Sequence, residues 1–282
     1  MSTILAADVS IEIAFNSSPY SYTPLDGVPG YGIEETCRRI SAAGWDAVEL
    51  AAVRPHAHPA DNSDERFERV ANALDAANLT PVHVCSHQVV LGLNPGSPDR
   101  REREAAIDHI RGMAEFCAAL DIPSFHFHPG WSHGDQSRDS AWETAIETID
   151  RALEDPVFEE VSALIEPLHW PISDLVHTPE DGLAFAGDLS NDVGLLIDTL
   201  QCHLDDIPLY DAIHLAGDAL AVIHLADTDR LPPRDGELDF ELVRDALEEI
   251  GFDGLASVEI WGDDPDKLAR RSHETTTELF NR

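Results

Sequence analysis

Ala163-Leu164-Ile165-Glu166 is a short apolar run that ends in a carboxylate, and the same pattern returns three more times along the chain. Leu195-Leu196-Ile197-Asp198, Val222-Ile223-His224 and Ser257-Val258-Glu259 follow at intervals of roughly 26 to 35 residues. Such an interval is about the length of one strand-loop-helix-loop unit of a (β/α)₈ barrel. Short apolar runs of this kind are typical of strands that a parallel sheet buries on both faces. An ionisable residue at the end of each of four buried strands indicates that the four share one function.

The four strand-end residues are three carboxylates and one imidazole. In a (β/α)₈ barrel the C-terminal ends of all strands meet at one mouth, where the active site lies. Carboxylates and imidazole are common ligands of divalent cations. The sequence therefore predicts one divalent metal site at the barrel mouth, formed by what we call the four-residue cluster: Glu166, Asp198, His224 and Glu259.

Strand and helix patterns alternate through the rest of the chain. Four further strands are expected within 7–14, 47–50, 81–86 and 124–128. Helices are expected at 32–43, 64–77, 101–120, 142–153, 179–189, 207–214, 240–250 and 265–280. This alternation predicts the α/β class and a (β/α)₈ TIM barrel, with residues 1–282 as a single domain. An open doubly wound sheet is the alternative, but no GxGxxG motif opens the chain.

The bulk composition is that of a globular protein, with 43% hydrophobic residues. The chain has no run of about 18 apolar residues, so no membrane span is expected. Its N-terminus shows no basic segment followed by an apolar one, so no signal peptide is evident. The cysteines, scattered without a CxxC motif, are expected to be reduced thiols of a cytoplasmic protein; they are Cys37, Cys85, Cys117 and Cys202.

The net charge is strongly negative. The chain has 54 acidic and 18 basic residues, which gives a formal charge of −36. Lys267 is the single lysine. Self-repulsion of this size destabilises a compact fold unless salt screens it. The composition resembles that of proteins from salt-accumulating halophiles. It also excludes ordinary nucleic-acid binding, which depends on basic surface.

Histidines follow two of the predicted strands with a spacing of two residues. His126 and His128 alternate with phenylalanines on the fourth strand, and His83 and His87 lie on and after the third. Alternation places such side chains inside the barrel. The deeper pair, His83 and His126, are interpreted as hydrogen-bonded core residues. His87 and His128 lie at the mouth, where contact with a substrate is expected.

The segment from His224 to Asp239 carries the most specific motif. At this point the chain resembles the xylose isomerase-like barrels, which include sugar-phosphate isomerases and epimerases, ketose 3-epimerases, hydroxypyruvate isomerase and enzymes acting on inososes. The resemblance runs over most of the chain. Its anchors, in order, are Val48-Glu49-Leu50, His128-Pro129-Gly130, Glu166-Pro167-Leu168, Asp198-Thr199, His224 with Arg230 six residues later, Gly236-Glu237-Leu238-Asp239, and Val258-Glu259.

The resemblance implies the identity of the cofactor and of several substrate contacts. In such enzymes the four-residue cluster binds one divalent ion, usually Mn²⁺, with Mg²⁺, Co²⁺ or Zn²⁺ as alternatives. Arg230 lies where the family often holds a substrate hydroxyl or phosphate. Ketose epimerases usually have a substrate-contacting histidine where this chain has Gln201, which can donate a hydrogen bond but cannot act as an acid. Trp131 and Trp170 follow strand ends and could shield a sugar from water.

A second resemblance points to a different chemistry. Endonuclease IV shares this fold and binds further zinc ions through histidines of the third and fourth strands. His87 and His128, together with Glu166, lie at plausible equivalents and could hold a second metal ion. However, the chain lacks an Asp-x-His pair after His224, Gln201 replaces another ligand, and the negative charge opposes DNA binding. A metal-dependent phosphodiesterase is therefore a minor alternative.

The two glutamates of the four-residue cluster come from strands five and eight, on opposite arcs of the barrel. A substrate that binds the metal through a carbonyl and an adjacent hydroxyl would lie between Glu166 and Glu259. One carboxylate can remove the proton next to the carbonyl to give an enediolate, and the other can return a proton. The predicted activity is a metal-dependent isomerase or epimerase.

The predicted substrate is a small-molecule sugar, a sugar phosphate or a polyol ketone. A lyase of the inosose dehydratase type, which begins with the same proton abstraction, is the main alternative. A non-catalytic binding module is another, but no ligand of the predicted metal site is missing. The sequence leaves a homo-oligomer open.

We expect the protein to require salt for stability. The screening length falls from about 10 Å at 0.1 M to about 3 Å at 1 M salt, so repulsion within the −36 charge weakens. The thermal midpoint, followed by circular dichroism, should rise by more than about 5 °C over this range. KCl and NaCl should act equally at equal ionic strength. A midpoint that is the same in dilute buffer and in molar salt would refute the prediction.

Overall fold

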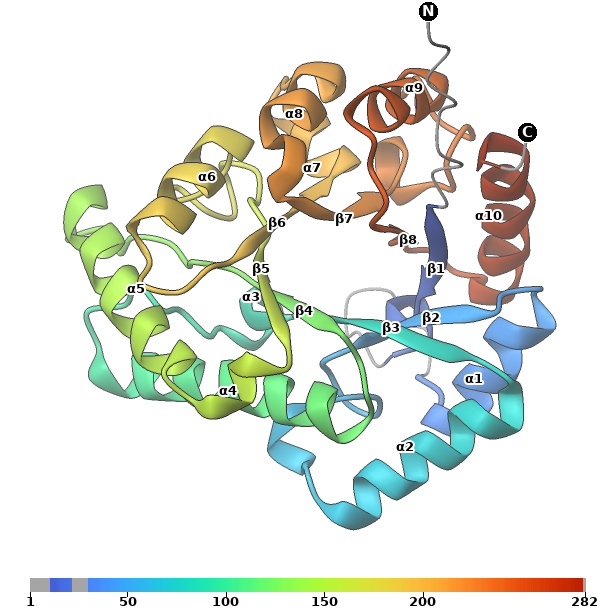
Figure 1. The fold of residues 1–282 in the computed structure, drawn as a ribbon, viewed down its shortest axis with the longest axis horizontal. Coiled ribbons are helices and arrows are strands. Elements are labelled where there is room, and N and C mark those ends of the chain that lie inside the picture. Colours follow the sequence, from blue (N-terminus) through green and yellow to red (C-terminus); the bar gives the residue numbers. More distant parts are fainter. Residues whose placement is uncertain (1–10, 22–29, 281–282) are drawn as a thin grey trace, which may run out of the picture.

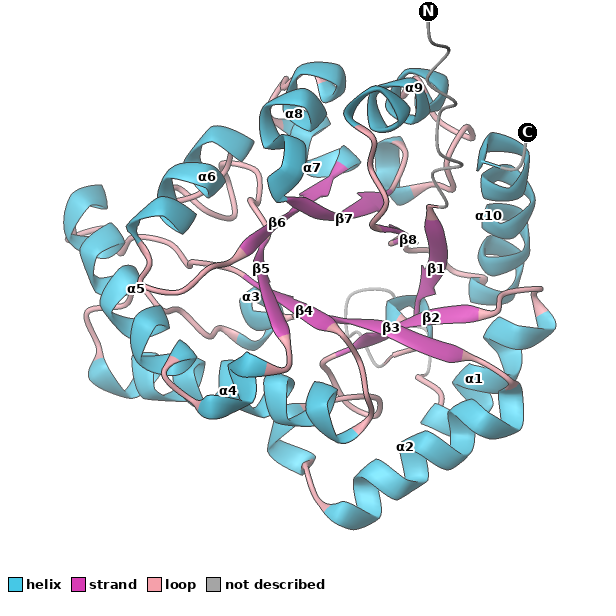
Figure 2. Ribbon diagram, in the orientation of Figure 1, coloured by secondary structure: helices cyan, strands magenta, loops and turns pink. Residues whose placement is uncertain are grey.

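The computed structural model describes residues 11–21 and 30–280; residues 1–10, 22–29 and 281–282 lie outside the description. Eight parallel strands close into a barrel in the order β1 to β8, each hydrogen-bonded to its neighbours in sequence. Helices surround this ring on the outside (Figures 1 and 2). The predicted (β/α)₈ TIM barrel is confirmed.

The strands are short and end close to the predicted functional residues. They are β1 (Glu12–Asn16), β2 (Ala47–Ala51), β3 (Thr80–Cys85), β4 (Ser124–Phe127), β5 (Ser162–Ile165), β6 (Gly194–Asp198), β7 (Leu220–Leu225) and β8 (Leu255–Val258). The first strand lies later than the predicted 7–14, of which residues 7–10 are outside the description. Its end is set by pairing, because Phe15 lies opposite Val48 and Asn16 opposite Glu49.

The helices agree with the predicted ones within two residues at each end, except that α5 begins four residues before the predicted 142 and that two short segments are additional. They are α1 (Ile33–Ala42), α2 (Asp64–Ala77), α3 (Gln88–Leu91), α4 (Arg100–Ala119), α5 (Arg138–Leu153), α6 (Pro179–Asp188), α7 (Thr199–Leu204), α8 (Leu209–Ala216), α9 (Phe240–Ile250) and α10 (Pro265–Phe280). Neither α3 nor α7 was predicted. Both are too short to show a helical period. The second, α7, begins directly at the end of β6. Asp198 caps it by accepting hydrogen bonds from the backbone N–H groups of Leu200 and Gln201.

The barrel interior is apolar at one level and polar at the next. The apolar cluster inside the ring consists of Ala14, Ala47, Val82, Leu164, Leu196, Val222 and Leu255. Strand side chains alternate between the two faces, so the residue two positions later also points inside. On β5, β6 and β7 these residues are Glu166, Asp198 and His224. The ionisable groups therefore lie in the layer directly above the apolar layer of the barrel interior.

The helices cover the outer face of the strands with a separate and larger apolar cluster, which includes Phe116, Phe125 and Phe185. Local signals fix the helix ends. Thr178 and Asp181 form a capping box at the start of α6, and Gly251 adopts the left-handed conformation at the end of α9. The start of α6 sets where the mouth loop after β5 ends, whereas the end of α9 leads into β8 at the opposite rim of the barrel.

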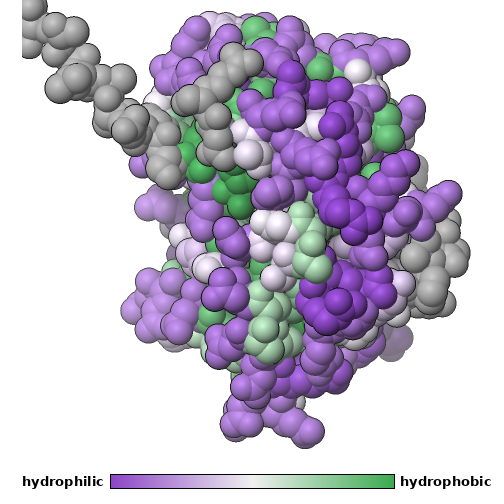
Figure 3. Space-filling model, turned by 90° about the vertical axis from the view of Figure 1, so that its right-hand side faces the viewer, coloured by the Kyte–Doolittle hydropathy of each residue, from purple (hydrophilic) through white to green (hydrophobic). Residues whose placement is uncertain are grey.

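The surface reflects the composition. The face seen in Figure 3 is mostly hydrophilic, with apolar residues in separate patches. Within the described residues, no helix is long and apolar enough to cross a membrane. Residence in the cytoplasm, adaptation to salt and the single domain over 1–282 stay predictions.

The joint between β7 and β8 gives a test of the fold. A Cβ atom at Gly254 would overlap the backbone carbonyl of Ala221 and lie 2.7 Å from the ring of Phe252. Gly254→Ala should therefore lower the free energy of unfolding by about 1–3 kcal/mol, measured by urea denaturation. Gly187→Ala, in α6 with open space around it, is the matched control and should raise stability by about 0.5–1 kcal/mol. Equal stability of the two variants would contradict this packing.

Candidate active site

The four-residue cluster converges at the barrel mouth as predicted. One ligand atom from each of its members can be chosen so that all four lie within 4.8 Å of one another. All four residues are buried, with at most 6% of each residue exposed. Parallel strands of a closed barrel bring residues from distant parts of the chain to one level, which is why these side chains meet.

The imidazole of His224 is held in one orientation. Its Nε2 lies 3.0 Å from Oε1 of Glu49, and the other carboxylate oxygen of Glu49, Oε2, accepts a hydrogen bond from the hydroxyl of Ser257. The other ring nitrogen, Nδ1, is buried without a hydrogen-bond partner. It lies 3.5 Å from Oε2 of Glu259 and 3.8 Å from Oε1 of Glu166. A buried nitrogen that faces two carboxylates without a hydrogen bond fits the place of a metal ligand.

Arg230 lies inside this arrangement. Its Nη1 donates to Oδ2 of Asp198 at 2.6 Å and to Oε2 of Glu259 at 2.9 Å. Among the residues that the structure describes, Arg230 forms no ion pair with Asp227 or Asp229 of its own loop. The positive charge of the guanidinium is therefore paired with the carboxylates of Asp198 and Glu259. Its Nε and Nη2 form no hydrogen bond to the described residues.

The loop that carries Arg230 is built around one buried carboxylate. Asp227 accepts hydrogen bonds from the backbone N–H of Thr228, Gly236 and Leu238. The backbone of Arg230 has a positive φ of 57°, a conformation that L-residues rarely adopt without support. Asp227 thus fixes the loop, and the loop directs the guanidinium inward.

The two glutamates of the cluster have opposite electrostatic surroundings. Burial raises the pKa of the Glu166 carboxyl well above its usual value, and the charges of Glu259 and Asp198 add to the effect. Burial acts in the same direction on Glu259, but Arg230 and His224 outweigh it and hold the pKa of Glu259 well below its usual value. Three carboxylates sharing one guanidinium leave an excess of negative charge that a divalent cation would balance.

A chain of imidazoles lies beneath Glu166. The backbone N–H of Ser86 donates to Nε2 of His126 at 3.1 Å, so the ring proton of a neutral His126 is on Nδ1. Nδ1 lies 3.0 Å from Nε2 of His83, whose Nδ1 lies 2.7 Å from the hydroxyl of Ser124. The interpretation of His83 and His126 as hydrogen-bonded core residues agrees with this chain. His126 is nevertheless close to the site, because its Nε2 lies 3.2 Å from Oε2 of Glu166.

The two mouth histidines occupy different surroundings. Nδ1 of His128 lies 3.6 Å from Oε2 of Glu166, and His126, His128 and Glu166 form a second group whose ligand atoms converge. His87 belongs to another contact, since its Nε2 lies 2.9 Å from the hydroxyl of Ser18. The second metal site considered for His87, His128 and Glu166 is therefore not assembled around His87 in this structure.

The remaining predicted contacts surround the mouth on the side of β5 and β6. Gln201 is buried in the first turn of α7, and its Oε1 accepts hydrogen bonds from both the backbone N–H and the ring Nδ1 of His169. Trp170 is 57% exposed, whereas Trp131 is partly buried and its backbone is tied to Asn94. Trp170 is thus the freer aromatic surface of the two.

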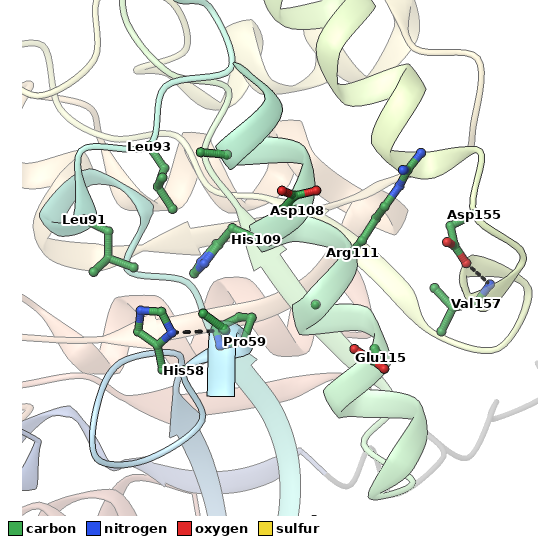
Figure 4. Close-up of a pocket in the computed structure, with 13 residues that line it drawn as sticks. His58, Pro59, Leu91, Leu93, Asp108, His109, Arg111, Glu115, Asp155 and Val157 are labelled. Carbon is green, nitrogen blue, oxygen red and sulfur yellow. Dashed lines mark hydrogen bonds between the residues drawn. The ribbon is translucent and has the colours of Figure 1, made fainter. Parts of the chain in front are cut away.

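A large cavity lies away from the mouth. It has a volume of about 880 Å³ and runs along α4, where His58 and His109 face each other with ring centroids 6.2 Å apart (Figure 4). Burial lowers the pKa of His109 to about 3, so its imidazole is neutral. The residues that line this cavity include no member of the four-residue cluster. Charge and potential ligands converge at the mouth, which we therefore take as the candidate active site.

Two residues gain importance from the structure. In the sequence Glu49 is part of the Val48-Glu49-Leu50 motif, and in the structure it holds the ring of His224. His169 was not identified as a site residue, although its place three residues after Glu166 in a mouth loop could have suggested it. Its contact with Gln201 joins the loop after β5 to the first turn of α7 and is not visible in the sequence.

Comparison with known proteins places the chain in a family. The model of the xylose isomerase-like TIM barrel family matches residues 37–279. The chain belongs to this family.

Individual relatives are more distant. A D-psicose 3-epimerase of Agrobacterium fabrum is 24% identical over 233 residues, which cover 78% of this chain and 76% of the relative. A D-psicose 3-epimerase of Enterocloster bolteae is 31% identical over 86 residues, so this match spans only 30% of this chain and 29% of that relative. The crystal structure of a D-psicose 3-epimerase with D-tagatose from Clostridium cellulolyticum H10 superposes with a TM-score of 0.78 at 18% identity, covering 96% of this chain and 99% of the other. That likeness concerns the fold.

The hydrogen bond between Glu49 and His224 leads to a prediction about metal affinity. Glu49→Gln keeps the shape of the side chain but removes the charge that orients and polarises the imidazole. Affinity for Mn²⁺, measured by isothermal titration calorimetry, should fall by about 10- to 100-fold. Glu143→Gln removes the same charge from the exposed face of α5 and should leave the affinity unchanged. If both variants bind Mn²⁺ as the wild type does, Glu49 has no part in the site.

Proposed function

We propose that this chain is a divalent-metal-dependent sugar isomerase or epimerase that moves a proton next to a carbonyl group. The observation that carries the proposal is the convergence of three carboxylates and the unpartnered Nδ1 of His224 at the mouth. The family supports it, since two relatives that each align over 78% of the chain are D-psicose 3-epimerases.

The residues fit a bound divalent ion. Glu166, Asp198, His224 and Glu259 would hold it, and Glu49 would fix the tautomer of His224 by accepting the hydrogen from Nε2. When bound, the ion supplies Lewis acidity that polarises a carbonyl group and acidifies the neighbouring C–H bond. We propose Mn²⁺ as the ion, with Mg²⁺, Co²⁺ and Zn²⁺ as alternatives.

The protein itself moves the proton. Glu166 follows β5 and Glu259 follows β8, so the two carboxylates approach a substrate at the mouth from different arcs of the ring. One carboxylate takes the proton from carbon while the electrons of the C–H bond form the C=C bond of an enediolate. The other carboxyl group then gives a proton to carbon. Return to the opposite face of the same carbon epimerises it. Return to the neighbouring carbon, with the hydroxyl hydrogen transferred from one oxygen to the other, interconverts aldose and ketose.

We propose that Arg230 contacts the substrate through the parts of its guanidinium that are not engaged. The positive charge of Arg230 is already balanced by Asp198 and Glu259. Because this charge is already paired, little of it remains to attract an anion. An uncharged ketose or polyol ketone is therefore a better substrate than a sugar phosphate. His87, His128, Gln201, Trp131 and Trp170 are proposed to complete the substrate contacts.

Exchange of a carbon-bound hydrogen of the substrate for deuterium tests the activity before the substrate is known. The protein loaded with Mn²⁺ is incubated in D₂O at high salt with D-psicose, D-tagatose, L-ribulose, an inosose or hydroxypyruvate. Deuterium should enter one carbon next to the carbonyl of at least one compound, as seen by nuclear magnetic resonance. Loss of water instead of exchange would indicate the lyase alternative.

Both carboxylates should be required for this turnover. Glu166→Gln and Glu259→Gln should each lower turnover by at least about 100-fold, since general acid–base groups commonly contribute this much. Circular dichroism should show that both variants keep the fold. Near-wild-type rates in both variants would show that the proton is moved by other groups.

A further inference from the structure

The two oxygens of the Asp198 carboxylate have different partners. Oδ1 accepts hydrogen bonds from the backbone N–H groups of Leu200 at 2.7 Å and Gln201 at 3.1 Å. Oδ2 is therefore the oxygen that remains for a metal ion. Nη1 of Arg230 donates to Oδ2 at 2.6 Å, and no other described residue donates a hydrogen bond to it. Arg230 thus binds the oxygen of Asp198 that the proposed ion would use.

The Glu259 carboxylate is divided in the same way. Its Oε1 accepts a hydrogen bond from the thiol of Cys85 at 3.5 Å. Its Oε2 lies 3.5 Å from Nδ1 of His224, the buried nitrogen that fits the place of a metal ligand. Nη1 of Arg230 donates to this Oε2 at 2.9 Å. At both carboxylates, therefore, the guanidinium contacts the oxygen on the side of the proposed ion.

The guanidinium is held in this position and is mostly buried. The side chain of Arg230 is 17% exposed, and Nη1 also donates to the backbone carbonyl of Glu259 at 3.2 Å. The carbonyl of Arg230 accepts the backbone N–H of Trp261. Charges in such a place interact strongly, because little solvent screens them. A positive charge this close to two ligand oxygens repels a cation that binds to the same oxygens.

A hydrogen bond to a metal ligand often has the opposite effect and supports the ion by orienting the ligand. Glu49 is placed for that role, because it contacts Nε2 of His224 and leaves Nδ1 for the ion. Arg230 differs from Glu49 in two respects. Its charge has the sign of the ion, and it contacts the oxygens on the side of the ion. Competition should therefore outweigh support.

We propose that Arg230 competes with the divalent ion for the carboxylates of Asp198 and Glu259. The competition lowers the affinity for the ion and keeps the ion exchangeable, while the guanidinium keeps these buried carboxylates paired whenever the ion leaves. The inference rests on the proposed function, because it concerns the ion of that same site. It assigns to Arg230 control of metal affinity, in addition to the proposed contact with the substrate.

The test replaces the charge and measures binding of the ion. Arg230→Gln removes the positive charge and keeps a side chain that can donate a hydrogen bond. Affinity for Mn²⁺, measured by isothermal titration calorimetry, should rise by about 10- to 100-fold, since one neighbouring charge commonly shifts a binding equilibrium by this much. After dialysis, the variant should retain more Mn²⁺ than the wild type, as measured by inductively coupled plasma mass spectrometry.

Thermal stability gives a second readout. Without the ion, Arg230→Gln leaves buried carboxylates unpaired, so its thermal midpoint in EDTA should lie more than about 5 °C below that of the wild type. Saturating Mn²⁺ should remove most of this difference. If the variant folds only with Mn²⁺, it is purified with the ion. The rate at which EDTA removes the ion, expected to be slower than for the wild type, then replaces the titration.

Two further variants serve as controls. Arg230→Lys keeps the positive charge and should bind Mn²⁺ more weakly than Arg230→Gln does. Arg234 lies in the same loop and also has a positive φ, but it pairs with Glu241 and Glu278 at the surface. Arg234→Gln should therefore keep the wild-type affinity for Mn²⁺.

The possible results lead to different conclusions. If Arg230→Gln binds Mn²⁺ as the wild type does, or more weakly, Arg230 does not compete with the ion and the inference is overturned while the proposed function stands. Equal affinities of the Gln and Lys variants would also overturn it, because the charge would not be the cause. If the wild type binds none of Mn²⁺, Mg²⁺, Co²⁺ and Zn²⁺, the proposed function fails, and this inference fails with it.

Discussion

Closure of the barrel is the constraint on which the rest of the structure depends. Eight strands joined in one ring point every second side chain into a narrow space with little room for water. Polar groups there must satisfy one another, because an unpaired buried polar group is costly. The contacts of His224 with Glu49, and of Glu49 with Ser257, are the consequence. So are the contacts that join His126, His83 and Ser124. These hydrogen bonds fix the orientation of the imidazole rings, so the side chains at the mouth are already in place when a ligand binds.

Charge plays opposite parts inside and outside this protein. On the surface, dissolved salt can screen the excess of acidic residues. At the mouth, three carboxylates lie together in a buried place where screening is weak. Arg230 balances part of this charge by pairing with Asp198 and Glu259. The part that is left, together with the unpartnered Nδ1 of His224, gives the site its affinity for a divalent cation in the proposed function.

The scaffold and the mouth loops contribute separately to the proposed activity. The strands supply the four-residue cluster, which is suited to proton transfer next to a carbonyl in any substrate that can reach it. The loop after β5 supplies His169 and the first turn of α7 supplies Gln201, and one contact holds these two segments together. Reaction type and substrate choice can therefore vary independently on one fold.

The sequence alone determined the barrel and the four residues that converge in it, because both follow from local patterns that repeat with the period of a strand and of a βα unit. It placed His126 and His128 inside for the same reason. It did not determine the limits of β1, which pairing with β2 sets. Nor did it predict α7, which is too short to show a period. The partners of Arg230, Glu49 and His169 were decided only by the tertiary structure. Each of these contacts joins residues more than 25 positions apart in the chain, and a one-dimensional pattern carries no information about which side chains meet across a closed ring.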